Sequence, residues 1–243
     1  MKEKIYTIPI NEAFDLCTEC AVCEFEKKEE LSRIEYALGA SMMEPDERIF
    51  TNKMGFCQRH SSMMLGTDNK LSLALVMKTH MDEIIDSMNE CIVELENTDE
   101  KSSIFKKREN TSIDRASDKI YEKQSTCAVC KRLSDTMDKF TENLLYMYDS
   151  DNSFREKFLS SKGFCLKHFS YMLKKAQKTF KGEKLKDFSI NLFKLEKENF
   201  QRVCDDTDWF TKKFDYRYAN EDWKNSKDAP QRACMKVAGY TDK

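Results

Sequence analysis

The chain has 243 residues, of which 40% are hydrophobic and 35% charged, and it contains only six glycines and three prolines. This composition describes a helix-rich globular protein and argues against an all-β fold, which would need more turn residues. No run of about 20 apolar residues is present to cross a membrane, and the net charge is −2.

The N-terminus carries no recognisable targeting signal. Met1-Lys2-Glu3-Lys4-Ile5 leads directly into Pro9 without the apolar core of a signal peptide. We therefore expect a cytoplasmic protein. In that reducing compartment, paired cysteines favour metal binding over disulfides.

Apolar residues at helical spacing predict the elements of the first half. A short helix follows the motif Cys20-Ala-Val-Cys23, with apolar positions at Leu31, Ile34 and Leu38. A longer helix carries a heptad-like stripe: Ala74, Met77, Met81, Ile84, Met88, Ile92 and Leu95. The next segment, 96–115, has no sustained apolar period and is dense in charged and polar residues, so we expect a mobile linker there.

The second half continues with the same helical period. One predicted helix carries Leu133, Met137, Phe140, Leu144 and Met147, and a long one runs from Leu185 towards Phe214. An aromatic segment follows, including Tyr216 and Trp223, and we expect it to pack back over the core. Asp228, Pro230 and Gly239 have the residue types of the N-cap, the first turn and the end of a short final helix.

No stretch shows convincing period-two alternation, so we expect an all-α helical bundle built from two related repeats. The predicted domains are residues 1–95 and residues 116–243. The net charge is −11 over residues 1–100 and +9 over residues 101–243. Halves of opposite charge are expected to pack together. The basic stretches of the second half are interspersed with acids, which argues against a nucleic-acid surface.

Two matching quartets of cysteine and histidine carry the recognisable chemistry. In the first, 33 residues separate Cys23 from Cys57, within Gly55-Phe56-Cys57-Gln58-Arg59-His60. In the second, 34 residues separate Cys130 of Cys127-Ala-Val-Cys130 from Cys165, within Gly163-Phe164-Cys165-Leu166-Lys167-His168. The spacing predicts one Cys3His metal site in each repeat. The ligands are therefore Cys20, Cys23, Cys57 and His60 for the first site, and Cys127, Cys130, Cys165 and His168 for the second.

Two zinc ions per chain are the predicted cofactors, because Cys3His is a common closed zinc set. An iron–sulfur cluster is the alternative, since three cysteines and one histidine can also hold iron. Reduced thiols or a disulfide couple are a further option. Closed sites leave no open coordination position, so a metal-dependent enzyme ranks third and we assign no catalytic residue.

The remaining cysteines and the third histidine have less specific surroundings. Cys17 could replace a ligand of the first site, but the second repeat has no counterpart, which favours an incidental thiol. Cys91, Cys204 and Cys234 are interpreted as buried small hydrophobes. His80 could approach the first site, although a solvated or hydrogen-bonded helix histidine is favoured.

The chain resembles a bacterial family of unknown function, found mainly in anaerobic Firmicutes. The resemblance rests on Glu3-Lys4-Ile5-Tyr6-Thr7-Ile8-Pro9, both Gly-Phe-Cys-x-x-His motifs, and the segments 75–80, 208–210, 213–217 and 225–229. It covers nearly the full length and implies one shared architecture with two metal knots, without an activity. Cys17 departs from the family pattern, which begins at Cys20.

The sequence therefore predicts an intracellular metal-binding protein that acts as a binding or regulatory module. Redox sensing or electron transfer by an iron–sulfur protein is the alternative. A protein partner is favoured over nucleic acid or membrane. The oligomeric state is left open.

Overall fold

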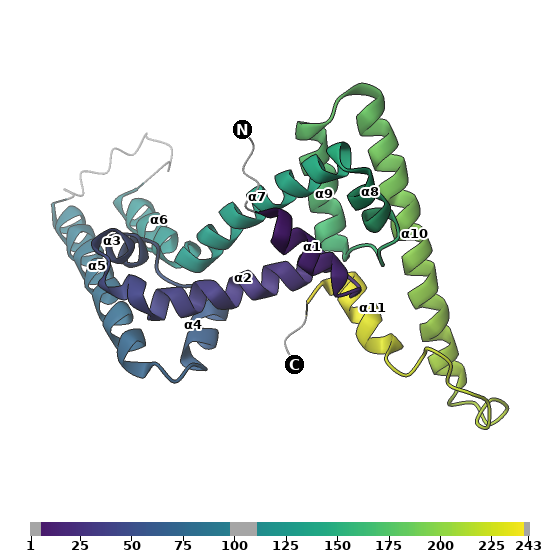
Figure 1. Cartoon of the computed structure of the whole chain (residues 1–243). Helices are drawn as coiled ribbons and strands as arrows, with labels where there is room; N and C mark the ends of the chain where they lie inside the picture. Colours follow the sequence, from purple (N-terminus) through teal and green to yellow (C-terminus); the bar gives the residue numbers. More distant parts are fainter. Residues whose placement is uncertain (1–5, 98–110, 241–243) are drawn as a thin grey trace, which may run out of the picture. The chain divides into compact units, whose positions relative to one another are not determined.

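The computed structural model describes residues 6–97 and 111–240. Within them it contains eleven α-helices, the 3-10 helix η2 and no strand, so the all-α prediction is confirmed (Figure 1). The helices are α1 Thr7–Asp15, α2 Ala21–Leu38, η2 Ala40–Met43, α3 Pro45–Met54, α4 Gln58–Leu65, α5 Lys70–Glu96, α6 Ser112–Ser125, α7 Ala128–Ser150, α8 Asn152–Leu159, α9 Leu166–Thr179, α10 Gly182–Lys212 and α11 Ala229–Ala238.

The chain forms two compact units whose division differs from the predicted domains 1–95 and 116–243. Unit 1 comprises Met1–Lys28 and Thr136–Lys243, and unit 2 comprises Glu29–Asp135. The two boundaries fall inside α2 and α7. Unit 2 is therefore an insertion within unit 1, and each sequence half contributes to both units.

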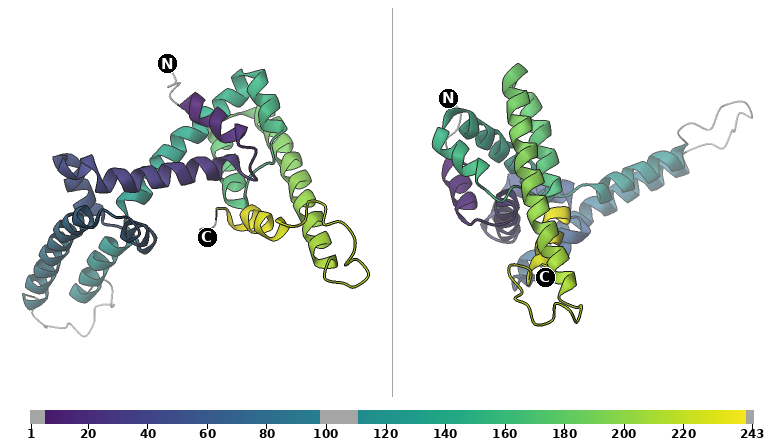
Figure 2. Two further views of the ribbon diagram at one scale, coloured as in Figure 1. Left: turned by 60° about the horizontal axis from the view of Figure 1, so that its bottom comes forward. Right: turned by 90° about the vertical axis from the view of Figure 1, so that its right-hand side faces the viewer.

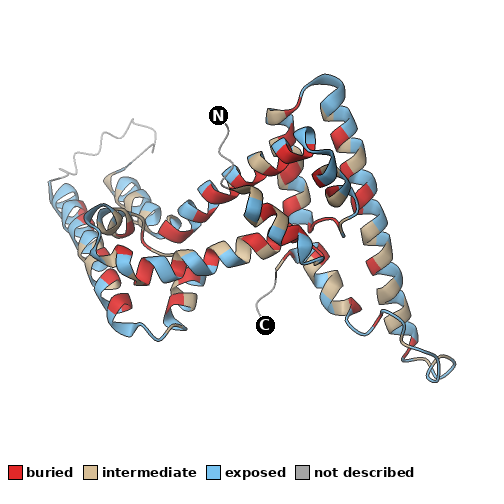
Figure 3. Ribbon diagram, in the orientation of Figure 1, coloured by how far each residue is buried: buried red, intermediate tan, exposed pale blue. Residues whose placement is uncertain are grey.

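Unit 1 has a core of aromatic and aliphatic side chains. Phe25 from α2 stacks on Phe140 from α7 with ring centroids 3.9 Å apart, and Phe140 is fully buried. Phe158 from α8 contacts Phe14, Tyr148, Phe164 and Phe188. All five apolar positions predicted between Leu133 and Met147 are buried, and the last four of them lie in unit 1. Figure 3 shows red bands along α7. Burial of this stripe explains why the segment forms one long helix.

Unit 2 has a smaller core. Its buried cluster consists of Ile34, Leu38, Met64, Leu73, Cys127 and Val129, with Phe56, Met63 and Met77 packed against it. Along α5 the buried side chains are Ser72, Leu73, Val76, His80, Ser87 and Cys91. Much of the predicted stripe therefore lies outside the core, because Met81, Met88, Ile92 and Leu95 are exposed.

The predicted linker 96–115 overlaps two observed helices. α5 extends to Glu96, and α6 begins at Ser112 behind a capping box formed by Thr111 and Asp114. Residues 98–110 lie outside the described part of the chain.

The C-terminal segment follows the prediction only in part. α11 begins after Asp228 and ends before Gly239, which has a φ of 85°, as expected. Trp223 packs against Phe210 of α10 and against Phe214, which follows this helix. Tyr216 is 86% exposed, so the expectation that it covers the core is wrong.

Two candidate metal centres

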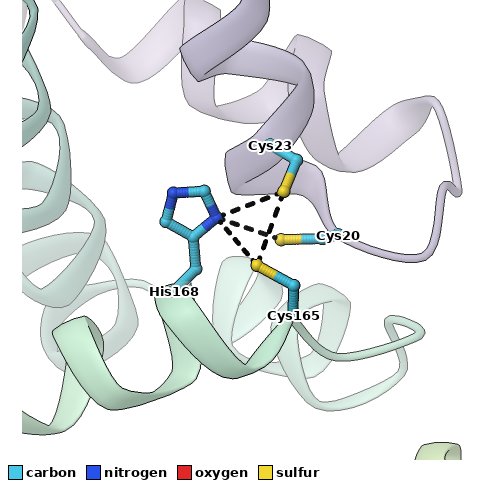
Figure 4. Close-up of side chains that lie close together, drawn as sticks. All are labelled: Cys20, Cys23, Cys165 and His168. Atoms are coloured by element: carbon cyan, nitrogen blue, oxygen red, sulfur yellow. Dashed lines mark hydrogen bonds between the residues drawn. The ribbon is translucent and has the colours of Figure 1, made fainter. Parts of the chain in front are cut away.

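The eight predicted ligands form two groups of four, but the groups cross the sequence repeats. Site A consists of Cys20 and Cys23 with Cys165 and His168 (Figure 4). Site B consists of Cys57 and His60 with Cys127 and Cys130. The predicted pairing of each CxxC with the next CxxH along the chain is therefore wrong, although the eight residues are the ones brought together.

The course of two long helices explains the crossed pairing. α2 begins beside the first CxxC in unit 1 and ends in unit 2, so the CxxH that follows it belongs to unit 2. α7 begins beside the second CxxC in unit 2 and ends in unit 1, so the next CxxH belongs to unit 1. Each centre consequently lies within one unit.

Site A is compact and sealed. The Nδ1 atom of His168 lies 3.5 Å from the Sγ atom of Cys20 and 3.3 Å from the Sγ atoms of Cys23 and Cys165. The Sγ atoms of Cys23 and Cys165 are 3.5 Å apart. All four side chains are buried. Figure 4 shows the three sulfur atoms gathered around one ring nitrogen.

Site B repeats this arrangement with more solvent access. The Nδ1 atom of His60 lies 3.2 Å from the Sγ atoms of Cys57 and Cys127 and 3.3 Å from that of Cys130. Cys57 and Cys130 are 3.8 Å apart at Sγ. Cys130 is exposed and Cys57 half-buried, whereas His60 and Cys127 are buried.

The start of a helix places each ligand pair. Cys57 and Cys165 occupy the N-cap positions of α4 and α9 in extended conformation, and their histidines follow in the first turn. The side chains at the N-cap and at the third helical position point the same way, so the Cys-x-x-His spacing converges two donors. The positive end of the helix dipole also favours nearby thiolates.

The glycine before each Phe-Cys pair adopts a left-handed conformation and faces a polar side chain. A Cβ atom on Gly55, which has a φ of 59°, would lie 2.3 Å from Nε2 of His80. A Cβ atom on Gly163, with a φ of 73°, would lie 2.8 Å from Oε1 of Glu196. Only glycine accommodates both the conformation and the close approach.

We expect Gly55→Ala to destabilise the protein more than Gly182→Ala. Gly182 has a similar φ of 56°, but a Cβ atom there would have nothing within 4 Å, so its replacement costs about 1 kcal/mol for backbone strain alone. Gly55→Ala adds the collision with His80, so denaturant unfolding should show a larger loss of unfolding free energy for Gly55→Ala than for Gly182→Ala. In Gly55→Ala/His80→Ala the ring is absent, so part of the lost stability should return. Equal losses for the two single variants would contradict this explanation.

A carboxylate accompanies the second ring nitrogen of each histidine. Nε2 of His60 lies 2.9 Å from Oε1 of Glu30, in hydrogen-bonding geometry. Nε2 of His168 lies 3.3 Å from Oε2 of Glu26, at ion-pair distance but without good hydrogen-bond alignment. Carboxylate–histidine pairs of this kind fix the ring orientation and leave Nδ1 available to a metal.

The basic residue before each histidine binds the same carboxylate. Arg59 donates to both oxygens of Glu30, and Lys167 donates to both oxygens of Glu26. The motif Cys-x-(Arg/Lys)-His therefore provides a ligand and an anchor for its carboxylate. The sequence motifs identify neither Glu26 nor Glu30. The basic residue before each histidine indicates that a carboxylate could lie nearby, but the sequence does not show which glutamate it is.

The electrostatics of both centres favour a cation. Burial alone would lower the pKa of His60, but its hydrogen bonds with Cys127 and Glu30 raise that pKa to about 10. Burial alone would also lower the pKa of His168, but its interactions with Cys165, Cys23 and Glu26 raise that pKa to about 11. These environments stabilise positive charge next to the thiols. A metal cation at Nδ1 would satisfy that preference and would replace a proton there.

The C-terminal helix covers site A. A Cβ atom on Gly239, which follows α11, would lie 3.5 Å from Sγ of Cys165 and 3.8 Å from Sγ of Cys23. The amine of Lys236 is buried and donates to the carbonyl of Glu19 at 2.9 Å, to that of Lys162, and to that of Phe164 at 3.4 Å. These carbonyls lie beside both ligand segments, so one lysine fastens the two segments together.

A buried glutamate also supports this side of site A. Glu196 from α10 accepts a 2.6 Å hydrogen bond from the backbone N–H of Phe164. Burial raises the pKa of Glu196 to about 7, although Lys236 and the N–H of Phe164 oppose the shift. Neither Lys236 nor Glu196 belongs to a sequence motif, so only the fold identifies them.

The other predicted cysteines and His80 lie outside both ligand groups. Cys17 is exposed and has a φ of 50°. His80 is buried, and its Nδ1 lies 2.6 Å from the carbonyl oxygen of Asn52, which confirms a hydrogen-bonded helix histidine. Cys91 is buried as expected. Cys204 and Cys234 are exposed, so their predicted burial is wrong.

These observations define an all-α protein with two Cys3His centres that could hold metal ions. The family model of DUF6062, a family of unknown function, matches residues 1–243, and the chain belongs to this family. The resemblance to a family of unknown function is thereby confirmed. Comparisons with curated proteins and with solved structures found no match. None of the described helices is both long enough and apolar enough to span a membrane.

Proposed function

We propose that this protein is an intracellular binding or regulatory module stabilised by two structural zinc ions. The observation that carries the zinc assignment is the spacing of the ligand atoms. In a tetrahedral site with Zn–S bonds of about 2.3 Å, two sulfur atoms lie about 3.8 Å apart. The Sγ–Sγ distances of 3.5 Å in site A and 3.8 Å in site B support a single ion of this kind at each centre.

The same spacing argues against the iron–sulfur alternative. A cluster distributes its protein ligands over several iron atoms and therefore separates their sulfur atoms more widely than one ion does. All ligand atoms of each centre lie within 4.8 Å of one another, which favours a mononuclear site. Redox sensing or electron transfer through a cluster thus has less support than a structural role.

A metal-dependent enzyme has the least support. Each centre supplies four protein donors, which complete a tetrahedral shell and leave no position for substrate or water. Such closed sites contribute their binding energy to folding. We infer that the ions hold ligand segments together so that the helices present a defined surface.

Elemental analysis of the full chain purified under anaerobic conditions tests the proposal. We expect a colourless protein with about two zinc ions per chain. Bound iron with sulfide and visible charge-transfer absorption would overturn the zinc assignment. A fully folded chain that contains no metal would overturn the structural role.

The difference in exposure between the centres predicts the order of metal loss. Site B contains the exposed Cys130, whereas all four ligands of site A are buried. A chromophoric chelator should therefore remove the first equivalent of zinc faster than the second. Cys130→Ser should abolish the fast phase, and Cys204→Ser, a change of another exposed thiol, should preserve it. A fast phase that persists in Cys130→Ser would contradict the assignment of this phase to site B.

A further inference from the structure

The outer half of α5 exposes a continuous apolar stripe. Met81, Ile85, Met88, Ile92 and Leu95 recur at alternating steps of four and three, which places them on one face of the helix. Their exposed fractions are 55%, 50%, 46%, 51% and 39%. Scattered exposed apolar residues need no explanation, but five in one line mark a candidate interaction surface.

This stripe is distinct from the face that α5 uses within unit 2. The buried residues of this half of the helix, Ser87 and Cys91, follow a different heptad line. α6 lies beside α5 in Figures 1 and 2, yet none of its fourteen residues, all described, is buried. α6 also exposes Ile113 by 69% and Tyr121 by 67%.

Ion pairs occupy one edge of the hairpin formed by residues 81–96 and 112–125. Arg115 pairs with Glu94 at 2.6 Å, and Lys119 pairs with Glu90. On a helical wheel of α5, Glu90 and Glu94 lie opposite the line of Met81, Ile85 and Met88. The pairs therefore fasten one edge of the hairpin, and the residues of unit 2 that the structure describes leave the apolar stripe uncovered.

The charge beside the stripe favours a basic partner over a second copy of this chain. Between Lys78 and Glu96 the sequence has six acidic residues and one lysine, Lys78, which pairs with Asp82 at 2.7 Å. Asp82 and Glu96 fall next to the stripe, at the positions that face a partner helix in a coiled coil. Two copies joined through this face would bring like charges together, which disfavours self-association.

We propose that this hairpin face binds an amphipathic helix of another protein, with apolar residues at three- and four-residue spacing and lysine or arginine along its flank. The stripe spans 14 helical steps from Met81 to Leu95, or about 21 Å, which corresponds to about four turns of the partner. Met81 and Met88 can adapt to different apolar side chains. The inference rests on the proposed function as a binding module, because it concerns the partner of that module.

Two synthetic peptides test the surface. Both have 21 residues with leucine at the a and d heptad positions, and they carry either lysine or glutamate at e and g. Fluorescence anisotropy with the full chain in its metal-loaded form should show saturable binding of the lysine peptide that weakens with salt. The glutamate peptide should bind at least tenfold more weakly.

Variants locate the binding on the stripe. Ile85→Asp/Ile92→Asp should weaken binding of the lysine peptide at least tenfold, while Ile49→Asp, a change of a 67% exposed isoleucine on α3, should leave it unchanged. Circular dichroism and zinc content of each variant should match the parent, because these side chains are half or more exposed.

The remaining outcomes overturn either the surface proposal or the zinc proposal, and they distinguish the two. Equal binding of the two peptides, or no binding by a chain that holds two zinc ions, would refute the surface and leave the zinc proposal intact. A dimer in sedimentation analysis that Ile85→Asp/Ile92→Asp dissociates would show that a second copy occupies the face. Binding of the lysine peptide by a folded chain without zinc would support the surface and refute the structural metal instead.

Discussion

Replacing Cys165 with alanine should reduce the metal content from two ions to one and should lower the free energy of unfolding by several kcal/mol. Cys165 is fully buried in site A, and its loss leaves two thiols and an imidazole without their fourth partner. Site A joins the start of α2 to the start of α9. Loss of its metal ion should therefore loosen these two helix ends. Elemental analysis and denaturant unfolding measure the two effects.

Cys204→Ala provides the matched control for this experiment. Cys204 is an exposed cysteine of the same unit and lies outside both ligand groups, so its replacement should change neither metal content nor stability. A Cys165→Ala protein that retains two ions and full stability would refute the structural role of site A.

The second large effect is expected from Lys236→Met. Lys236 is 1% exposed, and its amine donates to three backbone carbonyls beside the ligands of site A. The amine nitrogen of Lys236 also lies 3.7 Å from Oε2 of Glu19, and it interacts electrostatically with the carboxylate of Glu196. Methionine keeps the stem but leaves buried acceptors without a donor, so we expect a loss of about 3–5 kcal/mol.

Lys236→Met should also accelerate zinc loss from site A, since α11 would no longer be fastened over the sulfur atoms. Lys227→Met, a change of an exposed lysine just before α11, is the control and should alter neither stability nor metal release. Unfolding curves and chelator kinetics that coincide for the two variants would show that Lys236 does not hold the ligand segments.

Local spacing predicted the ligands but could not predict which pairs meet. Cys20-x-x-Cys23 and Cys57-x-x-His60 each converge two donors over one turn, so their residue types suffice to identify them. The intervals of 33 and 34 residues suggested pairing along the chain, but the crossed pairing uses the same two kinds of motif. Which motifs meet depends on where α2 and α7 carry the chain, and that is a tertiary property.

Helical period identified elements better than it identified their burial. The stripe on α7 is buried, whereas the comparable stripe on α5 faces outward from residue 81 onward. Cys204 follows the buried Val203 by one residue, which rotates it about 100° away from the core face of α10. Apolar character alone cannot distinguish a core face from a surface that awaits a partner.

Metal stoichiometry of two double variants tests the crossed pairing most directly. Cys20→Ala/Cys165→Ala removes two ligands of site A alone, so the chain should retain about one zinc ion after dialysis against a mild chelator. Cys20→Ala/Cys57→Ala removes one ligand from each site and should leave almost no metal. The reverse result, with metal retained only in Cys20→Ala/Cys57→Ala, would show that each centre is built from neighbouring motifs and would contradict this structure.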